Sequence, residues 1–159
     1  TRKARGPETE LVWYPDEAQY TRRLRRTVNK LIEHMKDLGP KSRDIAVLGV
    51  SRDSLPEELH APGFFTRPVV DAGGDPEGQV VQVGTLQSFK GLEAMAVVLV
   101  GLRDLDSLGS RQLAYVGGTR AKSFLRILLP DDIQETVQQR LPEILTLLDA
   151  DAAESGRQL

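Results

Sequence analysis

The chain has 159 residues, of which 40% are hydrophobic and 28% are charged, and its formal net charge is −2. This composition is typical of a soluble globular domain, and its acidic balance argues against a dedicated duplex binder, which is usually basic. The absence of cysteine excludes disulfides, thiolate metal sites and cysteine nucleophiles. The lack of cysteine fits a reducing cytosol, so we expect a cytoplasmic protein. No apolar run reaches the about 18 residues that a membrane span needs, so we expect no membrane partner.

The first third of the chain predicts a strand, a helix and a second strand. Residues 1–9 are polar and contain Gly and Pro, which favours a linker or a disordered terminus. ELVWY at 10–14 predicts a strand, and Pro15 to Glu17 predict the start of a helix. DIAVLGV at 44–50 predicts a buried strand. The apolar face of the helix is expected to comprise Leu24, Val28, Leu31, Ile32 and Met35.

Four arginines precede this apolar stripe, namely Arg22, Arg23, Arg25 and Arg26. Such a cluster is typical of a solvated helix face, and contact with nucleic-acid phosphates is the alternative.

The remaining pattern alternates strands with helices. Strands are predicted at 64–70, where Pro68 indicates an edge, and at 79–85, 96–101 and 124–129. A turn-rich loop is predicted at 71–78. Helices are predicted near Ser54, over 110–122 with a middle weakened by Gly117 and Gly118, and over 131–149 with a kink at Pro142.

This order predicts an α/β fold with a mostly parallel sheet flanked by helices, in one domain over 10–149 with a disordered tail at 150–159. Ligands of such folds bind beyond the carboxyl ends of the strands, where we expect both loops described next.

The segment TLQSFKGLE at 85–93 follows one predicted buried strand directly. The hydroxyl and amide groups of Thr85, Gln87 and Ser88 can bond phosphate or sugar oxygens. The alternative is structural, a capped connection from a strand to a helix.

The end of the same segment offers two further candidate residues. Gly91 allows a ligand to approach the backbone closely, and Glu93 can accept hydrogen bonds from a ribose. The alternative is that Lys90 and Glu93 are merely solvated.

The segment AYVGGTRA at 114–121 places Arg120 beside a Gly-Gly pair. A guanidinium can reach a polyphosphate across a domain cleft and stabilise a phosphoryl transition state. For Arg120 the alternative is a surface arginine paired with a neighbouring acid. For Tyr115 a ring that faces the core is the alternative to a ring on which a base stacks.

The two segments closely resemble motifs V and VI of superfamily 1 helicases of the UvrD/Rep type. Motif V of that family, T-x-H-x-x-K-G-L-E, matches 85–93 except at Gln87, where many members have histidine. Motif VI, Y-V-x-x-T-R-A, is matched within 114–121. The resemblance covers roughly residues 10–130 and is most specific over 80–130.

The resemblance implies a RecA-like fold of the P-loop NTPase type, with ATP and Mg²⁺ as cofactors. It implies that Gly91 and Glu93 serve the nucleotide, Glu93 through the sugar. Arg120 would be the catalytic arginine finger on the γ-phosphate. The residues implied to face single-stranded nucleic acid, DNA more than RNA, are Thr85, Gln87 and Ser88.

The other half of such a site is absent from the sequence. No G-x-x-x-x-G-K-[ST] phosphate loop occurs, and His34 and His60 have no partners at metal-ligand spacing, so no metal site is expected. In the resembled family the phosphate loop belongs to the first RecA-like domain. We therefore expect the chain to resemble the second domain, to need the N-terminal RecA-like domain of the same protein as a partner, and to lack ATPase activity alone.

DIAVLGVSRDS at 44–54 resembles motif IV, but Gly49 and Val50 stand where the family has an aromatic residue and an arginine. Arg52 is a candidate replacement for that arginine. The departure motivates an alternative function, a degenerate helicase-like domain that acts as a non-enzymatic binding or regulatory module. A helicase fused to a nuclease is a third possibility.

Overall fold

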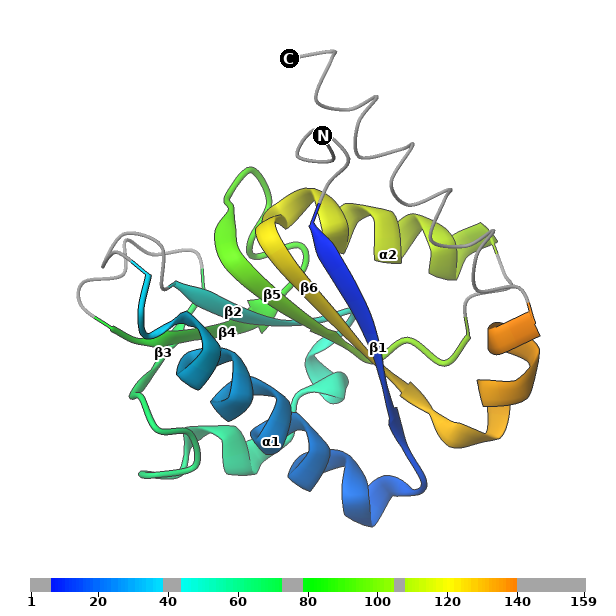
Figure 1. The fold of residues 1–159 in the computed structure, drawn as a ribbon, viewed down its shortest axis with the longest axis horizontal. Helices are drawn as coiled ribbons and strands as arrows, with labels where there is room; N and C mark the ends of the chain where they lie inside the picture. The colour runs from blue at the N-terminus through cyan, green and yellow to red at the C-terminus, as the bar shows by residue number, and fades with distance from the viewer. Residues whose placement is uncertain (1–6, 39–43, 73–78, 105–107, 140–159) are drawn as a thin grey trace.

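A computed structural model describes residues 7–38, 44–72, 79–104 and 108–139. Within these ranges six strands form one sheet in the order β1-β6-β5-β2-β4-β3, and all their pairings are parallel (Figure 1). This confirms the predicted α/β fold with a parallel sheet. The strands are β1 (Glu8–Tyr14), β2 (Ile45–Gly49), β3 (Val69–Asp71), β4 (Val81–Thr85), β5 (Ala94–Val100) and β6 (Ala121–Pro130).

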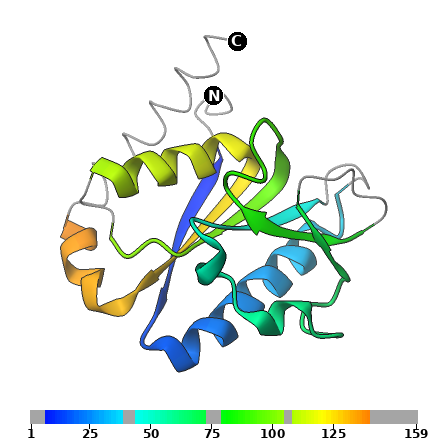
Figure 2. The same cartoon turned by 180° about the vertical axis from the view of Figure 1, so that it is seen from behind.

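Two long helices cover the two faces of the sheet, α1 (Glu17–Met35) and α2 (Leu108–Arg120) (Figures 1 and 2). The described residues also contain three short 3-10 turns, η3 (Arg52–Ser54), η4 (Glu57–His60) and η5 (Asp131–Ile133). Among the described residues, no helix is both long and apolar enough to cross a bilayer.

Several boundaries differ from the sequence-based prediction. β1 begins at Glu8, two residues earlier than predicted, because Glu8 and Thr9 continue the ladder with β6. The strand predicted at 64–70 is wrong before Pro68, since proline lacks the N–H that a ladder needs, and β3 starts directly after it at the sheet edge. The helix predicted near Ser54 is reduced to the two turns η3 and η4.

The C-terminal helix is described only in part. η5 opens it and helical structure continues to residue 139. The predicted kink at Pro142 and the predicted tail at 150–159 lie outside the described residues.

The sheet separates two apolar clusters, as buried strands with both faces covered require. Leu24, Val28 and Leu31 of α1 pack on one face, together with Val47 and Val98 of the sheet. The opposite face buries Leu48, Val97, Leu99, Leu125 and Ile127 beneath Ala114 of α2. Ile32, predicted on the apolar face of α1, is only partly buried at the margin of the first cluster.

The Gly-Gly pair has a packing role that the sequence pattern did not show. α2 continues through Gly117 and Gly118 without interruption. A Cβ at Gly117 would lie 3.0 Å from Leu99 Cδ2, and one at Gly118 would lie 3.6 Å from Leu125 Cδ2. The two glycines therefore let α2 lie close against β5 and β6, where it holds its last residue, Arg120.

The start of α1 depends on a capping contact. The Asp16 carboxylate accepts a hydrogen bond from the Gln19 N–H at 2.9 Å, which satisfies one of the free donors at the helix end. We expect Asp16→Ala to lower the free energy of unfolding by about 1 kcal/mol, and Asp16→Ser to retain most of it. Urea denaturation measures both, and an unchanged midpoint for the alanine variant would contradict the capping role.

Candidate functional site

The segment 85–93 begins as a hydrogen-bonded turn at the end of β4. The Thr85 N–H donates to Ser88 Oγ at 2.9 Å, and the Ser88 N–H donates to Thr85 Oγ1 at 3.1 Å. Ser88 Oγ–H donates in turn to the Thr85 carbonyl at 2.8 Å. The Ser88 proton is thus engaged within the turn, whereas the Thr85 hydroxyl has its own proton left to donate. The structural alternative was a capped connection from a strand to a helix. The capping bonds are present, but the turn does not continue as a helix.

Buried anchors hold this turn while its polar side chains point outward. Leu86 and Phe89 are buried, and the Leu86 N–H donates to the Gly49 carbonyl of β2 at 3.0 Å. Gln87 and Lys90 are exposed. The turn therefore presents the Gln87 amide on a fixed backbone, as a strand-binding group requires.

The segment then crosses the sheet from one end to the other. Thr85 pairs with Gly49, the last residue of β2. Ala94, directly after Glu93, lies before Ala96, which pairs with the first residue of β2, Ile45. Thr85 is therefore at the carboxyl ends of the strands, and Glu93 is at their amino ends.

Arg120 lies beside Glu93. It ends α2 directly before Ala121, and Ala121 is the register partner of Ala94. The backbones of Glu93 and Arg120 are thus neighbours at the amino ends of β5 and β6. The expectation that both motifs lie at carboxyl ends is wrong for these two residues, because one motif spans the sheet and the other precedes its strand.

Two features at this amino end fit a nucleotide. Arg120 Nε is buried and has no hydrogen-bond partner among the described residues, which is unusual and costly in a folded protein. Glu93 is exposed and has no hydrogen bond or ion pair within the described part of the chain. A free carboxylate beside an arginine matches the two halves of a nucleotide, the ribose hydroxyls and the phosphates.

The space beside Gly91, two residues before Glu93, is open. Its φ is +80°, a conformation that favours glycine, and a Cβ built there would meet nothing within 4 Å. The glycine is therefore required by the backbone conformation, and the open space beside it agrees with close approach by a ligand.

The carboxyl end carries a separate open hollow of about 740 Å³. Thr85 and Ser88 line it together with Arg52, His60 and Asp71. Arg52 therefore lies with the nucleic-acid candidates, at the opposite end of the strands from Glu93 and Arg120. This position argues against Arg52 as a replacement for a nucleotide-contacting arginine.

The departure from motif IV has a steric counterpart. A Cβ at Gly49 would lie 2.7 Å from the Ser51 carbonyl oxygen and 3.1 Å from Leu55 Cγ. An aromatic side chain cannot occupy this position without movement of the backbone that leads into η3. The loop after β2 is therefore built around the glycine.

Two tyrosines beside this loop are structural. The Tyr20 hydroxyl donates to the Ser54 carbonyl at 2.5 Å, and the Tyr14 and Tyr20 rings lie 5.0 Å apart. Burial is the main cause that raises the pKa of both hydroxyls above the usual value. Both tyrosines therefore stay neutral near pH 7. Tyr115, in the second motif, packs against the buried cluster beneath α2, which confirms its core-facing alternative.

Asp131 and Asp132 open η5. No group of three or more His, Asp or Glu side chains within the described ranges is arranged to hold a metal ion.

The parallel six-stranded sheet flanked by helices agrees with the predicted RecA-like α/β fold. It has the fold of a solved structure, the C-terminal domain of a possible DNA helicase from Lactobacillus plantarum, with a TM-score of 0.56. The match covers 79% of this chain and 75% of that one at 21% sequence identity, so it concerns the fold alone.

The sequence itself is similar to DNA helicase II from Haemophilus influenzae, with 32% identity over 111 residues. The matched region is 60% of this chain and 15% of that helicase, so the chain corresponds to a small part of the curated relative. No protein-family model matches the chain. The sequence similarity to part of a DNA helicase II and the fold shared with the solved domain both agree with the resemblance carried by the two motifs.

Proposed function

We propose that the chain is the second RecA-like motor domain of an ATP-dependent superfamily 1 helicase or translocase. The observation that carries the proposal is that the segment 85–93 reaches from the carboxyl ends of the strands to their amino ends. Glu93 meets Arg120 at the amino ends, and Thr85, Gln87 and Ser88 lie at the carboxyl ends. One end suits a nucleotide, and the other suits a nucleic-acid strand. A cytoplasmic location is part of the proposal.

ATP with Mg²⁺ supplies the transferable phosphoryl group when it is bound between this domain and an N-terminal RecA-like domain. Arg120 places its guanidinium at the phosphates, where it stabilises charge that develops on the γ-phosphate oxygens. Glu93 accepts hydrogen bonds from the ribose hydroxyls and orients the nucleoside.

At the other end, the exposed Gln87 amide and the Thr85 hydroxyl donate hydrogen bonds to the backbone of single-stranded DNA. Ser88 holds the turn in shape through its bonds to Thr85, which use its hydroxyl proton within the turn. A fixed turn matters because contacts to phosphates position a strand only when the donors are held in place.

The first test compares the chain with the complete protein that carries it. We expect the 159-residue chain to show no ATPase activity, with or without single-stranded DNA, because its sequence has no phosphate loop. The complete protein is expected to hydrolyse ATP, and single-stranded DNA is expected to stimulate turnover. A coupled phosphate-release assay measures both. Turnover by the purified chain would refute the division of the site between two domains.

A non-enzymatic binding or regulatory module is the second candidate, and the loop after β2 favours it. Gly49 and Val50 replace the aromatic residue and arginine of the resembled motif, and the loop is packed around the glycine. Strand binding by the complete protein without any ATP turnover would favour this second candidate over the motor.

A further inference from the structure

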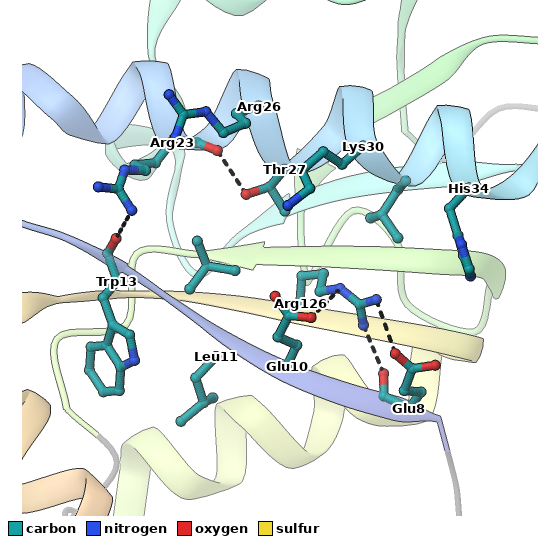
Figure 3. A pocket seen from close by; sticks show the side chains of 12 residues that line it. Glu8, Glu10, Leu11, Trp13, Arg23, Arg26, Thr27, Lys30, His34 and Arg126 are labelled. Carbon is teal, nitrogen blue, oxygen red and sulfur yellow. Dashed lines mark hydrogen bonds and ion pairs between the residues drawn. The ribbon is translucent and has the colours of Figure 1, made fainter.

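An open groove of about 460 Å³ runs between α1 and the edge strand β1, away from both ends described above (Figure 3). Arg23, Arg26 and Lys30 of α1 line one side. Glu8 and Glu10 of β1 and Arg126 of β6 line the other. The groove lies on the face of the sheet that α1 covers only in part.

Some charged side chains of the groove have ion-pair partners among the described residues, and others do not. Arg126, only 10% exposed, is ion-paired with Glu8 at 3.3 Å and with Glu10 at 3.8 Å. Arg126 thus offsets about half of the negative charge that Glu8 and Glu10 bring to the groove. Arg26 and Lys30 have no ion pair or hydrogen bond within the described residues, and they lie one helical turn apart on the same stripe. A row of uncompensated positive charge therefore borders the strand.

The backbone of β1 is open on the groove side. β6 is the only neighbour of β1 in the described sheet. The Trp13 carbonyl accepts a hydrogen bond from Arg23 Nη1 at 3.0 Å, so this carbonyl points away from β6. Because backbone groups alternate between the two edges of a strand, Thr9 and Leu11 also direct their N–H and C=O groups outward. Arg23 thus occupies the free edge of β1 at Trp13, and the outward backbone groups of Thr9 and Leu11 stay open.

We propose that this groove binds an extended acidic peptide segment of a partner protein, which adds to β1 as a seventh strand. Its backbone pairs with Thr9 and Leu11, and its acidic side chains on the α1 side meet Arg26 and Lys30. Side chains of the opposite parity pack beside Leu11 and Trp13, which are partly buried on the other face of the sheet. This partner site is independent of the proposed motor function.

Single-stranded nucleic acid is the competing occupant, and the free edge of β1 disfavours it. A phosphate backbone cannot use the outward N–H and C=O groups of β1 as a ladder partner does.

The test uses a fluorescein-labelled peptide of alternating glutamate and valine, which places every acid on one side of a strand. Fluorescence anisotropy measures its binding to the 159-residue chain. We expect the double variant Arg26→Glu, Lys30→Glu to weaken binding by about tenfold or more. The matched control is Arg22→Glu, Arg25→Glu, which reverses two charges of the same helix outside the groove and is expected to bind as the unaltered chain does.

A second readout tests directly whether the peptide adds to β1 as a strand. Amide hydrogen exchange at Leu11 and Thr9 is expected to slow when the peptide is bound, since their N–H groups gain partners. Thr9→Pro, which removes one outward donor without touching the ladder to β6, is expected to weaken binding.

Three results would overturn the proposal. They are no binding of the glutamate–valine peptide, equal binding of a lysine–valine peptide, and tighter binding of an oligothymidine that shows the same dependence on Arg26 and Lys30. The last result would identify the groove as a nucleic-acid contact.

Discussion

Arg120→Ala in the complete protein is expected to lower strand-stimulated ATP turnover by about 10³–10⁵-fold, the range for loss of an arginine finger. The reason is geometric, since Arg120 stands beside Glu93 with a buried Nε that no described group satisfies. Arg120→Lys should recover only a small part of the rate, because an ammonium keeps the charge but loses the planar set of donors.

Lys122→Ala provides the matched control for Arg120. Lys122 is exposed in β6, two residues further along, and its removal is expected to leave turnover unchanged. Circular dichroism checks that the fold survives in each variant. If the alanine variant at 120 keeps the unaltered turnover and remains folded, Arg120 is not the arginine finger.

Gly101→Ala is expected to have the largest effect on stability, a loss of about 3 kcal/mol of unfolding free energy. Its φ of +98° is unfavourable for any L residue. An added Cβ would lie 2.1 Å from Ser54 Oγ and 2.7 Å from Val50 Cγ2. Strain of roughly 1–2 kcal/mol and overpacking of about 1–3 kcal/mol act together.

Gly63→Ala separates these two causes. Gly63 has a comparable φ of +78°, but a Cβ there meets nothing within 4 Å. It is therefore expected to cost only about 1 kcal/mol, from backbone strain. Equilibrium urea denaturation compares the two variants. Equal losses would show that crowding around Ser54 does not matter, and the loop after β2 would then be less rigid than its packing indicates.

The buried strands were predictable because their signal is local. Runs such as AVLG and VVLV leave no polar face, which only a strand covered on both sides tolerates. Asp16 and the apolar stripe of α1 are likewise local signals. The two 3-10 turns after β2 were missed because LPEEL has helical composition but too few residues to propagate a helix.

The placement of the site residues could not be predicted to the same degree. That Glu93 adjoins Arg120 follows from the pairing of β5 with β6, which is a property of the whole sheet. The pairing of β1 with β6 joins residues at opposite ends of the described chain, and it alone brings Glu8 and Glu10 to Arg126. The sequence carried one signal for this cluster. A single arginine, Arg126, interrupts the apolar run FLRILL, and Glu8 and Glu10 are spaced to lie on the same face of a strand.

The segment from Thr85 to Glu93 has a thermodynamic consequence under the proposed function. It is one short connection, anchored by buried Leu86 and Phe89, that carries groups for the DNA strand at one end and for the nucleotide at the other. Free energies of binding to two such coupled sites are reciprocal. Whatever factor ATP imposes on strand affinity through this connection, the strand must impose the same factor on ATP affinity.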